Sequence, residues 1–168
     1  LYKSDTSKPK EFIKDVQIDT DFELLFPDNY INSITERLNL YNELSSTKSS
    51  VELLDFEKRL IDRFGELPVQ ALDLLDSVRL KWLAKEMGLE KVVLKQKRMI
   101  GYFISDQQSE FYQTEAFTKV LKYVQQNPTT SVIKEKQTKA GLRLLITFIK
   151  IDSVEIALKR LKKVLGHF

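Results

Sequence analysis

The sequence contains no cysteine and only one histidine, His167, which is the second residue from the end. The lack of cysteine excludes disulfide bonds, iron–sulfur clusters, thiolate zinc sites and cysteine nucleophiles. It also fits a reducing compartment, and we expect a cytoplasmic location. A lone terminal histidine leaves almost nothing for histidine-based catalysis or metal binding. We therefore expect neither a metal nor a cofactor.

Long apolar runs and nucleotide-binding motifs are also missing. No run approaches the roughly 18 apolar residues of a membrane span, and no secretory signal precedes the first elements. The five glycines form no phosphate-binding loop, no dinucleotide-binding turn and no nucleophile elbow. Asp73 and Asp76 could act as an acid–base pair only if burial separated their pKa values, but they lie opposite an apolar face and we expect them in solvent. The sequence thus predicts no enzymatic activity of its own.

Charge divides the 168 residues into two halves. The first 88 residues have a net charge of −5, whereas the remaining residues have a net charge of +8. Such a change of sign suggests two differently built halves. The basic half could attract nucleic acid or an acidic partner, or it could simply be a lysine-rich solvated face.

The first half is predicted to be mostly helical. Residues 1–12 look like a polar tail or linker, and residues 13–168 form the domain, with an extended segment over 15–26. Three helices follow within residues 28–88. The first is capped by Asp28 or Asn29, and its apolar face consists of Ile31, Ile34, Leu38, Tyr41 and Leu44. The second begins at Ser49 and ends at Gly65. The third begins near Pro68 and exposes its acidic side, and its apolar face consists of Val69, Leu72, Leu75, Val78, Trp82 and Leu83.

The second half, residues 89–168, alternates between strand and helix patterns. Two hairpins are expected, one turning at Lys95–Arg98 and one at 139–141, each followed by a helix, over 114–126 and 152–165. This order predicts an antiparallel sheet of two hairpins with helices packed on one face. The predicted fold class is α+β, with an N-terminal helical segment before the sheet.

The basic turn offers one candidate nucleic-acid contact. Lys95, Lys97 and Arg98 cluster there, and Tyr102 and Phe103 follow on the returning strand. Exposed aromatic rings can stack on bases, but strand alternation must turn one of these two rings into the core. A basic hairpin tip by itself predicts only non-specific attraction.

Three ordered motifs carry a family resemblance. They are Leu25–Ile31 (LFPDNYI), Arg37–Tyr41 (RLNLY) and Leu60–Pro68 (LIDRFGELP). In order and spacing they resemble the C-terminal domain of bacterial transcription-repair coupling factors (Mfd), over roughly residues 13–165. The chain begins with Leu1, and we expect it to be a fragment of a longer protein.

The resemblance implies a function for this part of the parent. The parent would be a cytoplasmic, ATP-driven DNA translocase that acts on stalled RNA polymerase and recruits UvrA, with its motor motifs outside this chain. The C-terminal domain would be a non-catalytic regulatory module that packs on the UvrB-like N-terminal module and covers the UvrA-binding surface. No membrane is implied.

Candidate docking residues lie at the end of the second predicted helix. Asp62 and Arg63 form a charged pair beside apolar positions, which suits a protein contact because charge gives orientation and apolar area gives affinity. Arg59 is a third candidate, at a position where the family often has an acidic residue. Alternatively, Asp62 and Arg63 only anchor the turn. We expect the apolar neighbours Leu60, Ile61, Phe64 and Leu67 to be core residues rather than interface residues.

Overall fold

A computed structural model describes residues 11–167. Residues 1–10 of the predicted tail lie outside the described part, and Phe12 packs edge-on against Phe111 with ring centres 5.7 Å apart. The elements, in chain order, are β1 Gln17–Thr20, α1 Ile34–Ser45, α2 Ser50–Phe64, α3 Val69–Glu86, β2 Leu89–Lys95, β3 Arg98–Phe103, the 3₁₀ turn η1 Glu110–Gln113, α4 Glu115–Gln126, β4 Ser131–Thr138, β5 Gly141–Ile149 and α5 Val154–Leu165. The α+β class is confirmed.

The helical segment has its own small core, built between α1, α2 and the first half of α3. Leu53, Phe56 and Leu60 of α2 are buried there, as the helical spacing predicts. Ser49 caps α2 by accepting a hydrogen bond from the amide of Glu52. Helix α2 ends at Gly65, whose φ of 90° favours glycine.

The prediction for α1 was wrong in two respects. Its N-cap is Ser33 rather than Asp28 or Asn29, so the helix begins later than expected. Ile31 is buried ahead of the helix, and the buried residues within it are Leu40 and Leu44. Ile34 and Leu38 are 67% and 57% exposed, because the packed face runs through Leu40 and Leu44, and Leu38 lies about 200° around the helix axis from Leu40.

The sheet has the order β1-β2-β3-β5-β4. Both predicted hairpins form, β2 with β3 and β4 with β5, and β3 joins them by pairing antiparallel with β5. The expectation of a purely antiparallel sheet was wrong, since β1 adds a parallel edge strand against β2. The sheet is therefore mixed. Strand β1, which precedes β2 by about 70 residues, forms hydrogen bonds with the edge of β2 that β3 leaves unpaired.

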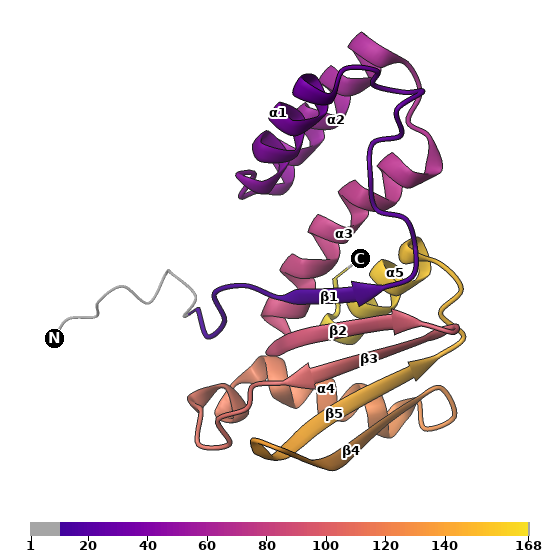
Figure 1. Cartoon of the computed structure of the whole chain (residues 1–168). Coiled ribbons are helices and arrows are strands. Elements are labelled where there is room, and N and C mark those ends of the chain that lie inside the picture. Colours follow the sequence, from indigo (N-terminus) through magenta and orange to yellow (C-terminus); the bar gives the residue numbers. More distant parts are fainter. Residues whose placement is uncertain (1–10, 168) are drawn as a thin grey trace, which may run out of the picture.

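Across residues 11–167, helices cover one face of the sheet and not the other. Figure 1 shows α3, α4 and α5 on the same side of it. Under them lies the larger core, which includes Val92, Met99, Phe103, Ile146 and Phe148 from the strands. As predicted, one of the two aromatic residues of β3 is buried: Phe103 has no exposed surface, and Tyr102 is half-buried. Within residues 11–167, no helix is long and apolar enough to span a membrane.

Helix α3 belongs to both cores, and this overturns part of its predicted pattern. Val69 and Leu72 are 64% and 40% exposed, although the periodicity placed them on the packed face. Asp76, expected in solvent, is only 8% exposed, because α3 packs along α5 as well as against the helical segment. Its carboxylate accepts a hydrogen bond from Arg79 Nη1 at 2.9 Å. A helix wedged between two layers has little free surface, so a single apolar stripe does not describe it.

Candidate docking site

The three predicted docking residues come together on one side of α2. Arg59, Asp62 and Arg63 are exposed and line the same hollow, of about 320 Å³, near the carboxyl end of the helix. Leu40, Phe56, Leu60 and Phe64 also line it, so the floor of the hollow is apolar. The geometry is that of a small apolar depression with charged residues at its rim.

The two arginines of the hollow are tied to α1. Arg59 pairs with Glu43 of α1 and also donates to Asp55, one turn back on α2, at 3.1 Å. Arg63 pairs with Glu36 of α1. These pairs join the two helices along their exposed side, and at such exposure each contributes about 0–1 kcal/mol to stability.

Both guanidinium groups also lie over aromatic rings. The Arg63 guanidinium carbon is 4.7 Å from the ring centre of Phe64, and that of Arg59 is 5.7 Å from the ring centre of Phe56. Hydrogen bonds to Glu43 and Asp55 raise the pKa of Arg59 further, so its charge is fixed at any ordinary pH. The two arginines of the rim are thus held in place by ion pairs with α1 and by contacts with aromatic rings of α2.

Asp62 differs from its neighbours. Among residues 11–167 its carboxylate forms no ion pair, and it is exposed at the rim of the hollow. Ile61 beside it is 41% exposed, which corrects its assignment to the core, whereas Leu60 is buried as expected. Phe64 and Leu67 are partly buried against the helical core. An available acid beside an exposed isoleucine provides both parts of a protein contact, orientation and apolar area.

Sequence reasoning missed the acidic partners of this site. Glu36 and Glu43 precede Arg63 and Arg59 by 27 and 16 residues. No local spacing rule connects residues so far apart, because such rules apply within one helix. The only signal was the seven-residue separation of the two glutamates, which puts both on one face of α1.

The predicted nucleic-acid residues lie outside this hollow, on the β2–β3 turn of the sheet. Lys95, Lys97 and Arg98 are all exposed. The Nζ atom of Lys95 is 3.1 Å from a carboxylate oxygen of Asp19 on β1, so this lysine is partly neutralised. Among the described residues, the other two form no ion pair.

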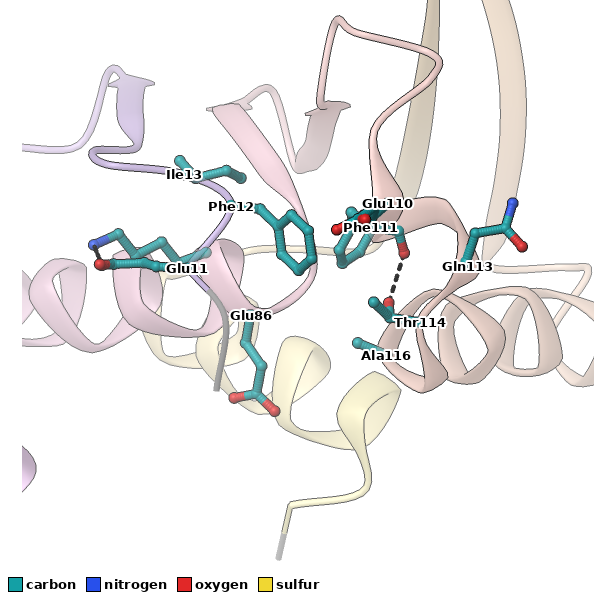
Figure 2. A pocket seen from close by; sticks show the side chains of 10 residues that line it. Glu11, Phe12, Ile13, Glu86, Glu110, Phe111, Gln113, Thr114 and Ala116 are labelled. Carbon is teal, nitrogen blue, oxygen red and sulfur yellow. Dashed lines mark hydrogen bonds and ion pairs between the residues drawn. The ribbon is translucent and has the colours of Figure 1, made fainter. Parts of the chain in front are cut away.

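A larger cavity, of about 930 Å³, lies where the N-terminal segment meets η1 and α4. Figure 2 shows Phe12 beside Phe111 in its wall, where the two rings pack edge-on. The hydroxyl group of Thr114 donates to the carbonyl oxygen of Phe111 at 2.6 Å. Lys85 in its lining pairs with Glu11 at 3.0 Å, and the carboxylate of Glu86 is hydrogen-bonded to Nε2 of His167 at 2.7 Å. Within residues 11–167, no cluster of three or more histidine or acidic side chains could hold a metal ion.

Comparison with known proteins gives concordant results. The family model of the TRCF domain matches residues 20–114. A transcription-repair-coupling factor of Staphylococcus aureus (strain NCTC 8325 / PS 47) is 26% identical over an alignment of 164 residues, and the match covers 92% of this chain and 14% of that protein. The Escherichia coli (strain K12) transcription-repair-coupling factor is 41% identical over 68 residues, 40% of this chain and 6% of that protein.

The fold has a counterpart among solved structures. The crystal structure of a C-terminal domain of transcription-repair coupling factor superposes with a TM-score of 0.64 and 17% identity, covering 90% of this chain and 96% of that one. The present chain spans only about a seventh of the length of the Staphylococcus aureus relative. Because the matched family model covers more than half of its residues, the chain belongs to the TRCF domain family.

Proposed function

We propose that this chain is a non-catalytic docking domain that regulates a longer protein of the transcription-repair coupling factor type. The observation that carries the proposal is the convergence of Arg59, Asp62 and Arg63 on one apolar hollow. The partner surface would belong to a UvrB-like N-terminal module of the same longer protein. By occupying that surface, the domain keeps it from UvrA until the parent engages RNA polymerase.

Membership of the family supports a further proposal about the parent protein. The parent would be a cytoplasmic, ATP-driven DNA translocase that releases stalled RNA polymerase and recruits UvrA for nucleotide-excision repair. This chain would supply the control surface, and the motor would lie elsewhere in the parent. We retain the division of the chain into a tail, residues 1–12, and a regulatory domain, residues 13–168, as part of this proposal.

The charges at the hollow suit a reversible contact. Exposed ion pairs contribute little to stability. Arg59 can therefore leave Glu43, and Arg63 can leave Glu36, to pair with acidic residues of a partner at a small cost in free energy. Within the described residues Asp62 has no such pair to break, so its carboxylate can pair directly with a cation of the partner. The free domain should bind weakly, because a tether within one chain raises the effective concentration to roughly the millimolar range.

A pair of charge reversals tests the proposal. The double variant Asp62→Lys/Arg63→Glu reverses the site without changing net charge. The matched control, Glu155→Lys/Lys159→Glu, reverses an exposed ion pair on α5, which lies outside the hollow. We expect only the first variant to weaken binding of the domain to the UvrB-like module and, placed in the parent, to increase UvrA binding. If the two variants bind equally well, the site is wrong.

DNA binding by the β2–β3 turn is the second candidate function. Its specific support is the exposure of Lys97 and Arg98 without an ion pair among residues 11–167. It predicts salt-dependent binding of duplex DNA that declines when Lys95, Lys97 and Arg98 are replaced by alanine. A flat titration at low salt would eliminate it.

A further inference from the structure

In the part of the chain that the structure describes, one face of the sheet has no helical layer. Figure 1 shows α3, α4 and α5 behind it and the other side free of helices. The free face can be assigned by alternation, because neighbouring residues of a strand point to opposite sides. The central strands β3 and β5 send Met99, Phe103, Ile146 and Phe148 into the core. Their intervening residues therefore belong to the free face.

The centre of this free face is apolar. On it, Ile100 lies opposite Thr147, and Tyr102 lies opposite Leu145. Ile149 continues the row along β5. All are half-buried except Leu145, which is 8% exposed. Two adjacent strands thus present a continuous strip of apolar groups.

Lysines border the strip on both sides. On β2, Lys91 lies opposite Tyr102, and Lys95 lies opposite Arg98 of β3, while Val93 is between the two lysines. On the other side, β4 places Lys134 opposite Leu145, followed by Lys136 two residues on. Val132 precedes them and is 39% exposed. The arrangement is an apolar strip between two rows of cations.

Few acidic groups compensate these cations. Asp19 pairs with Lys95 at 3.1 Å, and Glu90 pairs with Arg143 at 3.0 Å. Within the described part of the chain, Lys91, Lys134 and Lys136 form no ion pair. The face therefore keeps a positive charge along both borders, which attracts an acidic partner.

We propose that this free face is a docking surface for an acidic amphipathic helix of a protein partner. Strands are about 4.8 Å apart, so β2 to β4 spans roughly 14 Å, close to the diameter of a helix with its side chains. Along β5, Leu145 to Ile149 covers about 13 Å, or roughly nine residues of a helix. Such a helix would set apolar residues on the strip and acidic residues against both lysine rows. This surface is separate from the hollow on α2.

The chemistry of the strip favours a helix over single-stranded nucleic acid. Bases bind to protein sheets mainly by stacking on aromatic rings. Of the described residues on this face, Tyr102 is the only aromatic one, and its ring is already in contact with cations. The Lys91 ammonium is 5.7 Å from the ring centre, and the Arg143 guanidinium carbon is 5.5 Å from it. The remaining strip residues are aliphatic or threonine, which suit leucine side chains.

An NMR titration of the isotopically labelled chain tests the proposal. The probe is a synthetic amphipathic peptide of about 18 residues, with leucines on one face and glutamates on both flanks. We expect shifts of the amides of Ile100, Tyr102 and Thr147. The variant Lys91→Glu/Lys134→Glu should bind the peptide about tenfold more weakly or worse. The control Lys122→Glu/Lys163→Glu, on the exposed sides of α4 and α5, changes net charge equally and should bind normally.

Several results would overturn the proposal. One is the absence of shifts on the free face at about 1 mM peptide. Another is an equal loss of binding in the control variant, which would indicate general charge attraction. Oligothymidylate that shifts the same amides at lower concentration than the peptide would assign the face to nucleic acid. Concentration-dependent broadening of these amides without peptide would assign it to a second copy. Circular dichroism of each variant establishes that the fold is retained.

Discussion

The hydroxyl group of Tyr30 donates a hydrogen bond of 2.8 Å to the carbonyl oxygen of Gly65, 35 residues further along the chain. Its ring also packs against that of Phe64, with centres 5.7 Å apart. Tyr30 lies in the motif ahead of α1, and Gly65 in the motif that ends α2. The two sequence motifs are therefore in contact in the folded structure. This contact fixes the end of α2 beside the docking hollow.

Removal of this hydroxyl should loosen the end of α2. We expect Tyr30→Phe to lower the free energy of unfolding by about 1 kcal/mol, because the carbonyl of Gly65 loses its partner while the ring stays packed. Urea denaturation measures the change. Tyr102→Phe is the control, since its ring contacts are to cations and are kept by phenylalanine. Equal effects of the two variants would contradict the assignment.

Asp76 should give stability a distinct pH dependence. Burial raises the pKa of its carboxyl above the ordinary 3.8, with the hydrogen bond from Arg79 opposing the shift. The folded state then holds the proton more tightly than the unfolded chain, so this group's contribution to stability falls as pH rises. The decline begins near the unfolded pKa and ends above the folded one.

Comparison with Asp76→Asn isolates this effect, because asparagine does not titrate. We expect the stability of the wild-type chain, relative to the variant, to decrease as pH is raised from about 3.8 and then to level off. Urea unfolding of both proteins across this range provides the measurement. Parallel curves would mean that Asp76 titrates alike in the folded and unfolded chains.

Gly88 is expected to tolerate no side chain. Its φ is +77°, and a Cβ atom there would be 2.3 Å from the ring of Phe111. Gly88→Ala should therefore cost about 3 kcal/mol or more, from backbone strain of about 1–2 kcal/mol plus overpacking. Gly166→Ala is the matched control, since its φ is +75° but no atom lies within 4 Å. Thermal unfolding should show a larger loss of stability for Gly88→Ala than for Gly166→Ala. Similar losses would mean that contact with the Phe111 ring adds nothing to the cost of the positive φ.

A change of residues in the β2–β3 turn should stabilise the chain. Lys95 pairs with Arg98, so the loop has two residues, and both have positive φ, 52° for Gln96 and 61° for Lys97. This is the geometry of a type I′ turn, which Asn-Gly prefers. Replacing Gln96-Lys97 by Asn-Gly should stabilise the chain by about 1–2 kcal/mol, since left-handed conformations cost that much in ordinary residues. The Ala-Ala replacement, which keeps the strain, should bring no gain in the urea midpoint.

Local patterns predicted most elements because the forces behind them are local. The cap at Ser49, the stop at Gly65 and the two hairpins depend on neighbours a few residues away. The predicted α1 face was wrong because it ran through Leu38 rather than Leu40, and two residues along a helix turn its surface by about 200°. The three candidates on α2 could be chosen from one helix and its motif, but their acidic partners on α1 could not.

The amino-acid sequence alone determined the α+β class, the order of helices and hairpins, and the family resemblance, since periodicity, turn residues and motif spacing are written along the chain. Tertiary structure decided what lies between distant segments. It placed β1 on the edge of β2, buried Asp76 between two layers, paired Arg63 with Glu36 and, among the described residues, left one face of the sheet without helices. These features depend on which surfaces meet when the two cores form, and packing between remote residues has no period in the sequence.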